Sequence, residues 1–282
     1  MRNARGFTIV EILVVLIILG IVLAMAAMVT RGVSAGQKRS LTTTRLTGVD
    51  AAIVQFVAVQ KRMPCPADGS LPSTDANAGT ETARDPVAGC TAQTTGVVPW
   101  RILGLAEQDA TDGWNRRLTY RTDPVLGANN AMDMSACDPA GTGPLVGGKC
   151  NSIASGCSST APGSCTPPQT YLAGKGLEVH NLTGAIAMNP AAVPSTGAAY
   201  VVISPGETGG GGYLAGSGTL SATTDSDGNE EKKNYANVNP LPAYYVDDSL
   251  SDVAGATHFD DVVSRPSVLT VANKAGLGPR SH

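Results

Sequence analysis

The sequence predicts an α+β protein, in which one long N-terminal α-helix packs on a small antiparallel β-sheet head with long, disulfide-clamped loops. Three observations support this fold class. No proline occurs between residues 7 and 63, and the apolar positions of that stretch follow helical spacing. Short apolar segments separated by Gly- and Pro-rich stretches follow it. All six cysteines lie in this later part of the chain, which we expect to form a head over residues 64–282.

The first helical segment is almost purely apolar. Residues 7–29 contain one charged residue, Glu11. At 1.5 Å per residue the segment would extend about 35 Å, which is enough to cross a bilayer. Arg2 and Arg5 precede it and should keep the N-terminus in the cytoplasm. A cleaved secretory signal peptide is the alternative, but such signals have shorter apolar cores of about 7–15 residues.

The second helical segment, residues 30–63, is amphipathic. Its apolar residues recur at intervals of three and four positions, which marks one face of a helix: Leu46, Val49, Ile53, Phe56 and Val57. Pro64 and Pro66 cannot continue a helix, so residues 7–62 should form one helix of about 84 Å. Gly32 and Gly36 weaken its middle and predict a bend there.

The head contains a few segments with strand patterns among many polar residues. Residues 97–105 are the first compact apolar segment, and residues around Leu118 and Tyr120 alternate as in a short strand. Residues 198–206 are the clearest strand, because their centre is continuously apolar. Residues 242–248 and 258–271 predict further strands or short helices.

The cysteines predict disulfide bonds, since an even number in a translocated domain is typical of a disulfide framework. Six cysteines allow 15 pairings. We expect neighbours to pair, namely Cys65 with Cys90, Cys137 with Cys150, and Cys157 with Cys165. A zinc site is the alternative, but the sequence has no C-x-x-C pair to support it.

The charge distribution and the absence of catalytic motifs argue against two classes of function, nucleic-acid binding and catalysis. Residues 1–62 carry a formal charge of +6 and residues 63–282 carry −9, and an acidic head argues against nucleic-acid binding. The three histidines (His180, His258 and His282) belong to no H-E-x-x-H motif, and we expect no catalytic site.

One acidic loop could hold a metal ion. Its oxygen-bearing residues alternate on a predicted tight turn, as calcium sites require: Asp225, Asp227, Asn229 and Glu231. Gly228 stands at the fourth position of this run, whereas an EF-hand loop has its glycine at the sixth. A solvated acidic loop is the other interpretation, and we expect no further cofactor.

The N-terminal residues "RGFTIVEILVVLIILGIVLAM" resemble the N-terminus of type IV pilins and type II secretion pseudopilins. That family has a basic leader, a Gly-Phe cleavage point, and a Glu five residues after the cut. The resemblance implies that residues 1–6 are a leader peptide, that a prepilin peptidase cuts between Gly6 and Phe7, and that the new amino group of Phe7 is methylated.

The resemblance also explains Glu11. A lone carboxylate in apolar surroundings costs several kcal/mol unless it is paired or protonated. Cleavage creates an ammonium on Phe7, and in a filament of packed helices Glu11 of one subunit can meet that ammonium on its neighbour. Because the pair forms only in the right axial register, Glu11 would align the subunits during assembly.

The function that follows is that of a filament subunit, a minor pilin, because the head is large and loop-rich. Two alternatives remain, a type II secretion pseudopilin and a membrane-tethered periplasmic binding domain that does not polymerise. The expected partners are the prepilin peptidase, other pilins or pseudopilins, an inner-membrane assembly platform and membrane lipid. The expected location is the bacterial inner membrane, with a single pass and a periplasmic head, and afterwards the filament.

Overall fold

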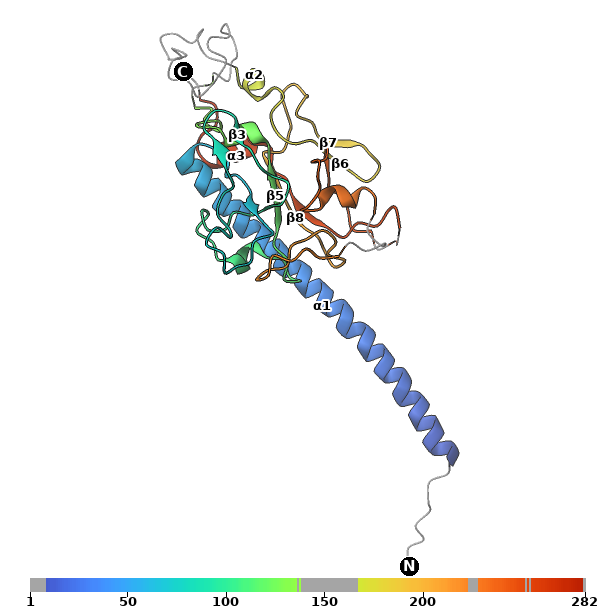
Figure 1. The fold of residues 1–282 in the computed structure, drawn as a ribbon. Coiled ribbons are helices and arrows are strands. Elements are labelled where there is room, and N and C mark those ends of the chain that lie inside the picture. Colours follow the sequence, from blue (N-terminus) through green and yellow to red (C-terminus); the bar gives the residue numbers. More distant parts are fainter. Residues whose placement is uncertain are drawn as a thin grey trace, which may run out of the picture.

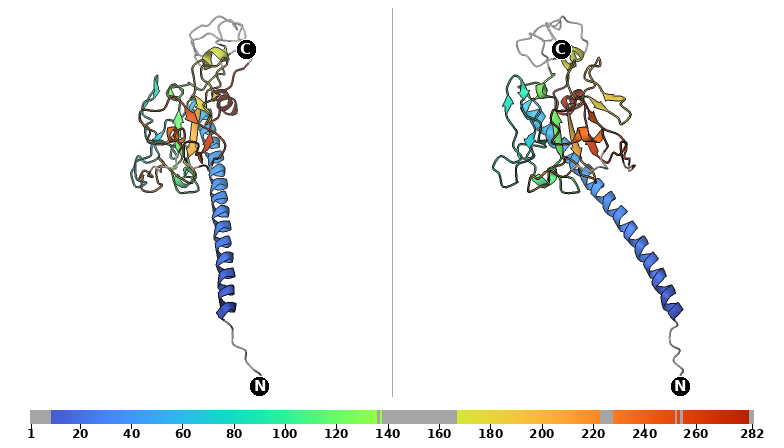
Figure 2. Two further views of the ribbon diagram at one scale, coloured as in Figure 1. Left: turned by 90° about the vertical axis from the view of Figure 1, so that its right-hand side faces the viewer. Right: turned by 45° about the vertical axis from the view of Figure 1, so that its right-hand side comes forward.

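The protein consists of a long helix, α1, that projects from a compact head (Figure 1). The computed structural model describes residues 9–135, 137, 167–222, 228–251, 253 and 255–280, and the side chains of Glu11 and of residues 22–33 are outside this description. Helix α1 spans Ile9–Gln60, so its 52 residues extend about 78 Å. It is helical through Gly32 and Gly36, and Figures 1 and 2 show it as one continuous rod without the expected bend.

Helix α1 ends at Gln60, close to the predicted end. Lys61 adopts a left-handed backbone conformation with a φ of 57°, and its N–H still donates to the carbonyl oxygen of Val57. This arrangement is a common helix stop. The stop comes before Pro64, so the prolines follow a helix that has already ended.

The C-terminal half of α1 forms one wall of the head core. Leu46, Val49, Ile53 and Val57 are at most 4% exposed, as their spacing predicts. Phe56 is an exception, because it is only half-buried and lies under the guanidinium of Arg62 at 4.9 Å. Phe56 therefore lies at the edge of the packed face of α1, although it fits the apolar pattern.

The main sheet has five strands in the order β1-β4-β5-β8-β10. All neighbouring strands in it are antiparallel, as predicted. The strands are β1 (Ala67–Asp68), β4 (Gly96–Val97), β5 (Thr119–Thr122), β8 (Tyr200–Ser204) and β10 (Val262–Ser264).

Strand β8 is apolar from Tyr200 to Ile203 because both of its faces are covered there. Tyr200 and Val202 belong to the core that α1 lines, whereas Val201 and Ile203 belong to a second core on the opposite face. Successive side chains of a strand point to opposite faces, so a strand between two cores needs apolar residues at every position. This explains why residues 198–206 give the clearest strand signal in the sequence.

Smaller elements complete the head. Strands β7 (Ile186–Met188), β6 (Val179–His180) and β9 (Tyr245–Val246) form a three-stranded sheet in that order. The β6–β9 pair is parallel, so this second sheet, which the sequence did not predict, is mixed. Strands β2 (Arg84–Asp85) and β3 (Gly89–Cys90) form a hairpin. The short helices are α2 (Pro168–Leu172), α3 (Val268–Lys274), η1 (Glu107–Ala110), η2 (Pro124–Gly127) and η5 (Glu231–Asn234).

Residues 258–271 contain both a strand and a helix. Strand β10 ends before Pro266, and Ser267 then caps α3 by accepting a hydrogen bond from the backbone N–H of Thr270. The sequence left the choice between strand and helix open for this segment.

The predicted disulfide between Cys65 and Cys90 is present, and it clamps the loop that follows α1. Cys137 is buried and disulfide-bonded. Cys150, Cys157 and Cys165 lie outside the described residues, so the other two expected pairings stay predictions.

A fully buried arginine holds several loops on the main sheet. The guanidinium of Arg121, on β5, donates to the carbonyl oxygens of Gly96 at 2.6 Å, Ala236 at 2.6 Å and Thr94 at 3.3 Å. Burial lowers the pKa of this guanidinium. In the described part of the chain no carboxylate forms an ion pair with Arg121, so its charge is offset mainly by carbonyl dipoles.

Candidate functional site

The N-terminal half of α1 is an apolar surface that the head leaves uncovered. Figure 2 shows this half extending away from the head in two views. Its large apolar side chains between residues 9 and 21 range from 47% to 85% exposed. The residues are Ile9, Val10, Ile12, Leu13, Val14, Val15, Leu16, Ile17, Ile18, Leu19 and Ile21. A helix that is apolar all round requires lipid or other helices as its surroundings.

The residues predicted to carry processing and subunit pairing are close to this segment in the sequence. Gly6 and Phe7 lie outside the described residues, and so does the side chain of Glu11. Cleavage after Gly6 and pairing through Glu11 therefore stay predictions.

A loop of the head fixes the direction in which α1 leaves it. One guanidinium nitrogen of Arg45 donates to the carbonyl oxygens of Thr111 and Asp112, both at 3.0 Å. The hydroxyl of Thr42 accepts from the backbone N–H of Gly113 at 2.9 Å. A side chain at Gly113 would place its Cβ 2.3 Å from the carbonyl oxygen of Lys38, so only glycine permits this close approach.

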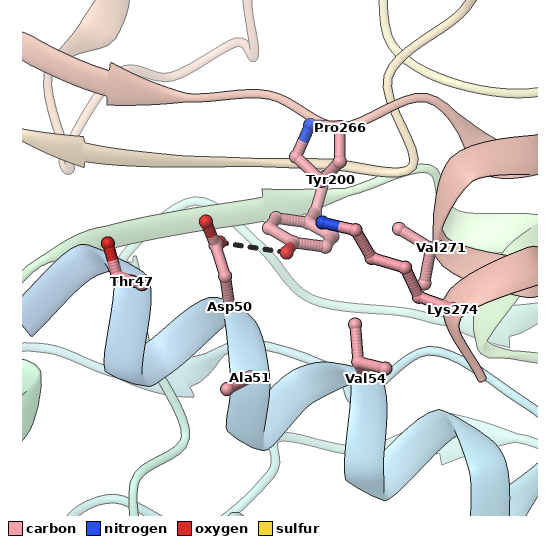
Figure 3. Close-up of a pocket in the computed structure, with 8 residues that line it drawn as sticks. All are labelled: Thr47, Asp50, Ala51, Val54, Tyr200, Pro266, Val271 and Lys274. Atoms are coloured by element: carbon pink, nitrogen blue, oxygen red, sulfur yellow. Dashed lines mark hydrogen bonds between the residues drawn. The ribbon is translucent and has the colours of Figure 1, made fainter.

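A pocket of about 380 Å³ lies where α1 meets α3 and the main sheet (Figure 3). Its lining is mostly apolar, with Val54 on α1, Pro266 after β10, and Val271 on α3. Two groups of opposite charge, Asp50 on α1 and Lys274 on α3, also line it.

Asp50 joins α1 to two strands of the main sheet. Its carboxylate accepts hydrogen bonds from the hydroxyls of Tyr200 on β8 at 2.8 Å and Ser264 on β10 at 2.7 Å. Figure 3 shows the first of these bonds within the pocket. Burial raises the pKa of the Asp50 carboxyl, while the two hydrogen bonds and the charge of Lys274 act in the opposite direction. Burial and the nearby Asp50 carboxylate also raise the pKa of Tyr200 far above its usual value.

This arrangement predicts that Asp50→Asn makes the head less sensitive to pH. A carboxyl whose pKa is raised in the folded state stabilises the fold most below its unfolded value of about 3.9. That stability is lost as the pH rises through the folded pKa, because ionisation is then harder in the folded protein. Between pH 4 and 8, the free energy of unfolding should therefore fall more for the wild type than for Asp50→Asn.

Urea unfolding of both proteins across this range measures the difference. Asp248→Asn is the matched control, because hydrogen bonds lower the pKa of that half-buried carboxyl. If the free energy of unfolding changed with pH equally in the wild type and in Asp50→Asn, a raised pKa of Asp50 would be contradicted.

The sequence analysis missed Asp50, Arg45 and Gly113 as residues that join α1 to the head. A signal for Asp50 was available, because a lone carboxylate stands between the buried positions Val49 and Ile53. Such a residue must find hydrogen-bond partners when its helix packs. Its partners, 150 and 214 residues further along the chain, could not be read from the sequence.

The predicted calcium loop is only partly described. Asp225 and Asp227 lie outside the described residues, and Asn229 is exposed. Glu231 is 1% exposed, and it lies beside His258 and Asp260 in the interior of the head. Glu231 thus belongs to a buried cluster and not to a solvated loop, while the calcium site itself stays a prediction.

Comparisons with known proteins give one match. Residues 1–27 match the family model of the prokaryotic N-terminal methylation motif. Comparisons with curated proteins and with solved structures gave no match. Among the residues that the structure describes, we find no helix whose length and apolar character suffice to span a membrane.

The matched motif accounts for the basic leader, the Gly-Phe cleavage point and the acidic residue that follow one another at the N-terminus. It implies processing by a prepilin peptidase and assembly with other pilin-like subunits. Gly6, Phe7 and Glu11 all lie within the matched residues. The chain is therefore a protein with a prokaryotic N-terminal methylation motif, consistent with the type IV pilin-like proteins.

Proposed function

We propose that this protein is a minor pilin, a filament subunit that polymerises through the N-terminal half of α1. One observation carries the proposal: the methylation motif at residues 1–27 includes the start of α1, whose described large apolar side chains between residues 9 and 21 are exposed. On assembly these side chains exchange contact with lipid for contact with the apolar side chains of equivalent helices, so they remain shielded from water throughout. The head remains on the outside of the filament, held by the Arg45 and Asp50 contacts.

Before assembly, residues 7–29 hold the protein in the inner membrane with the head in the periplasm. Arg2 and Arg5 lie on the cytoplasmic side, where the prepilin peptidase cuts after Gly6. The Cys65–Cys90 disulfide supports a periplasmic head, because disulfides persist in oxidising compartments. The protein acts through assembly and not as an enzyme.

The mass of the mature N-terminal peptide tests this route. We expect a chain that begins at Phe7 and carries a methyl group on its amino nitrogen. A chain that begins near Ala27 or Ala35 would show cleavage by a signal peptidase and would overturn the proposal. Cells that lack the prepilin peptidase serve as the control and should retain residues 1–6.

A type II secretion pseudopilin is the second candidate, and the same motif favours it. Shearing separates the two, because a surface filament is released into the medium whereas a pseudopilus stays with the cell envelope. Recovery of the protein in sheared filaments supports the minor pilin. Retention in the envelope, together with a mature N-terminus at Phe7, favours the pseudopilin.

A further inference from the structure

Three buried side chains with metal-binding groups meet beneath the head surface. Glu231 comes from η5, and His258 and Asp260 come from the segment that leads into β10. One donor atom from each lies within 4.8 Å of the others. The three residues are 1%, 7% and 2% exposed, so this cluster is separated from bulk water.

The cluster is short of positive charge. His258 Nδ1 lies 2.9 Å from Glu231 Oε2, and within the described ranges no lysine or arginine forms an ion pair with Glu231 or Asp260. Burial raises the pKa of the Glu231 carboxyl, and the neighbouring Asp260 carboxyl adds to that rise. Two carboxylates buried side by side need a cation or a shared proton between them.

We propose that Glu231, His258 and Asp260 bind one divalent transition-metal ion of the zinc class. Such ions are bound by imidazole nitrogen and carboxylate oxygen at about 2.0–2.2 Å. In the tetrahedral coordination typical of zinc, two donors at that distance from one ion lie about 3.3–3.6 Å apart. His258 Nδ1 and Glu231 Oε2, which are 2.9 Å apart, would therefore separate by a few tenths of an ångström to admit the ion. Calcium is disfavoured here, because it takes six to eight oxygen ligands and the cluster includes an imidazole.

The remaining hydrogen bonds of the cluster orient its carboxylates. Glu231 accepts from the backbone N–H groups of Gly228 at 3.0 Å and Asp260 at 2.8 Å. Asp260 accepts from the backbone N–H of Thr208 at 2.7 Å. Outer partners of this kind hold ligands in position for a metal ion. The ion would thus tie η5 and the loop after β8 to the segment before β10.

Metal titration of the full-length protein in detergent tests the proposal. The protein is first stripped with a chelator, and the zinc and calcium bound are then measured by mass spectrometry after equilibrium dialysis. We expect one zinc ion per chain and a rise of about 5–10 °C in the unfolding temperature at saturating zinc. Calcium should produce neither effect at the same concentration.

Substitutions locate the site. Glu231→Gln and His258→Gln should each lower zinc affinity by at least tenfold, since each removes or weakens one ligand. Glu230→Gln and His180→Gln are the matched controls, because both residues lie outside the cluster, and these variants should bind zinc like the wild type. Equal zinc binding by His258→Gln, or a preference for calcium, would overturn the proposal.

A measurement on the wild type alone tests the site even if the variants fail to fold. Co²⁺ replaces zinc in nitrogen and oxygen sites and absorbs visible light when it is bound in a protein. Visible bands that saturate at one Co²⁺ per chain and disappear on addition of zinc support the site. Without any Co²⁺ or zinc binding by the wild type the proposal fails, and a shared proton then accounts for the two carboxylates. The result is independent of filament assembly, which the N-terminal mass tests separately.

Discussion

Glu11→Ala should prevent the protein from entering filaments while leaving cleavage after Gly6 and membrane insertion intact. In the proposed filament, Glu11 neutralises the ammonium of Phe7 on a neighbouring subunit in an apolar environment. Removal of one member of a buried ion pair costs about 3–5 kcal/mol, because the other charge stays buried without a partner. At about 1.4 kcal/mol per factor of ten, incorporation should fall by at least about 100-fold.

The measurement is the amount of protein in sheared filaments relative to the membrane fraction. Val10→Ala is the matched control, because it shortens the neighbouring side chain on the same exposed surface and keeps the carboxylate. It should lower incorporation only modestly. If Glu11→Ala subunits enter filaments at the wild-type level, the helix does not assemble through this pair, and a membrane-tethered domain becomes the better interpretation.

Arg121→Met should destabilise the head by about 2–6 kcal/mol. The substitution keeps much of the side-chain volume but removes the donors to the buried carbonyl oxygens of Gly96 and Ala236. A buried polar group left without a hydrogen bond costs about 1–3 kcal/mol. Since a domain is typically stable by about 5–15 kcal/mol, the loss would be a large share of the total.

Urea unfolding of the full-length protein in detergent measures this loss. Arg101→Met is the control, because Arg101 also donates to backbone carbonyl oxygens, those of Asp75 and Ala76, but is exposed to water. It should change the free energy of unfolding by no more than about 0.5 kcal/mol. Equal effects of the two substitutions would contradict a special role for the buried arginine.

Much of the fold could be predicted because its signals are local. The spacing of Leu46, Val49, Ile53 and Val57 identified the packed face of α1, since helical periodicity follows from backbone geometry alone. The apolar centre of β8 and the Cys65–Cys90 bond were likewise predicted from neighbouring residues.

One error is local, because α1 continues through Gly32 and Gly36 without the expected bend. The others concern relationships between distant segments. The sequence does not specify that β6 pairs in parallel with β9, because such pairs join residues brought together only by the complete fold. Phe56 fits the helical pattern, yet the head core ends before reaching it, so its ring is only half-buried.

The N-terminal motif, the long helix and its division into an exposed apolar half and a packed half could all be read from the order of residues. These features depend on the order and period of residues along one segment, and periodicity within a segment is readable without knowing its neighbours. The partners of Asp50, and the contact of Glu231 with His258 and Asp260, became known from the folded chain alone. Buried polar groups must find hydrogen-bond partners wherever the packed chain supplies them, and here those partners lie on segments far apart in the sequence.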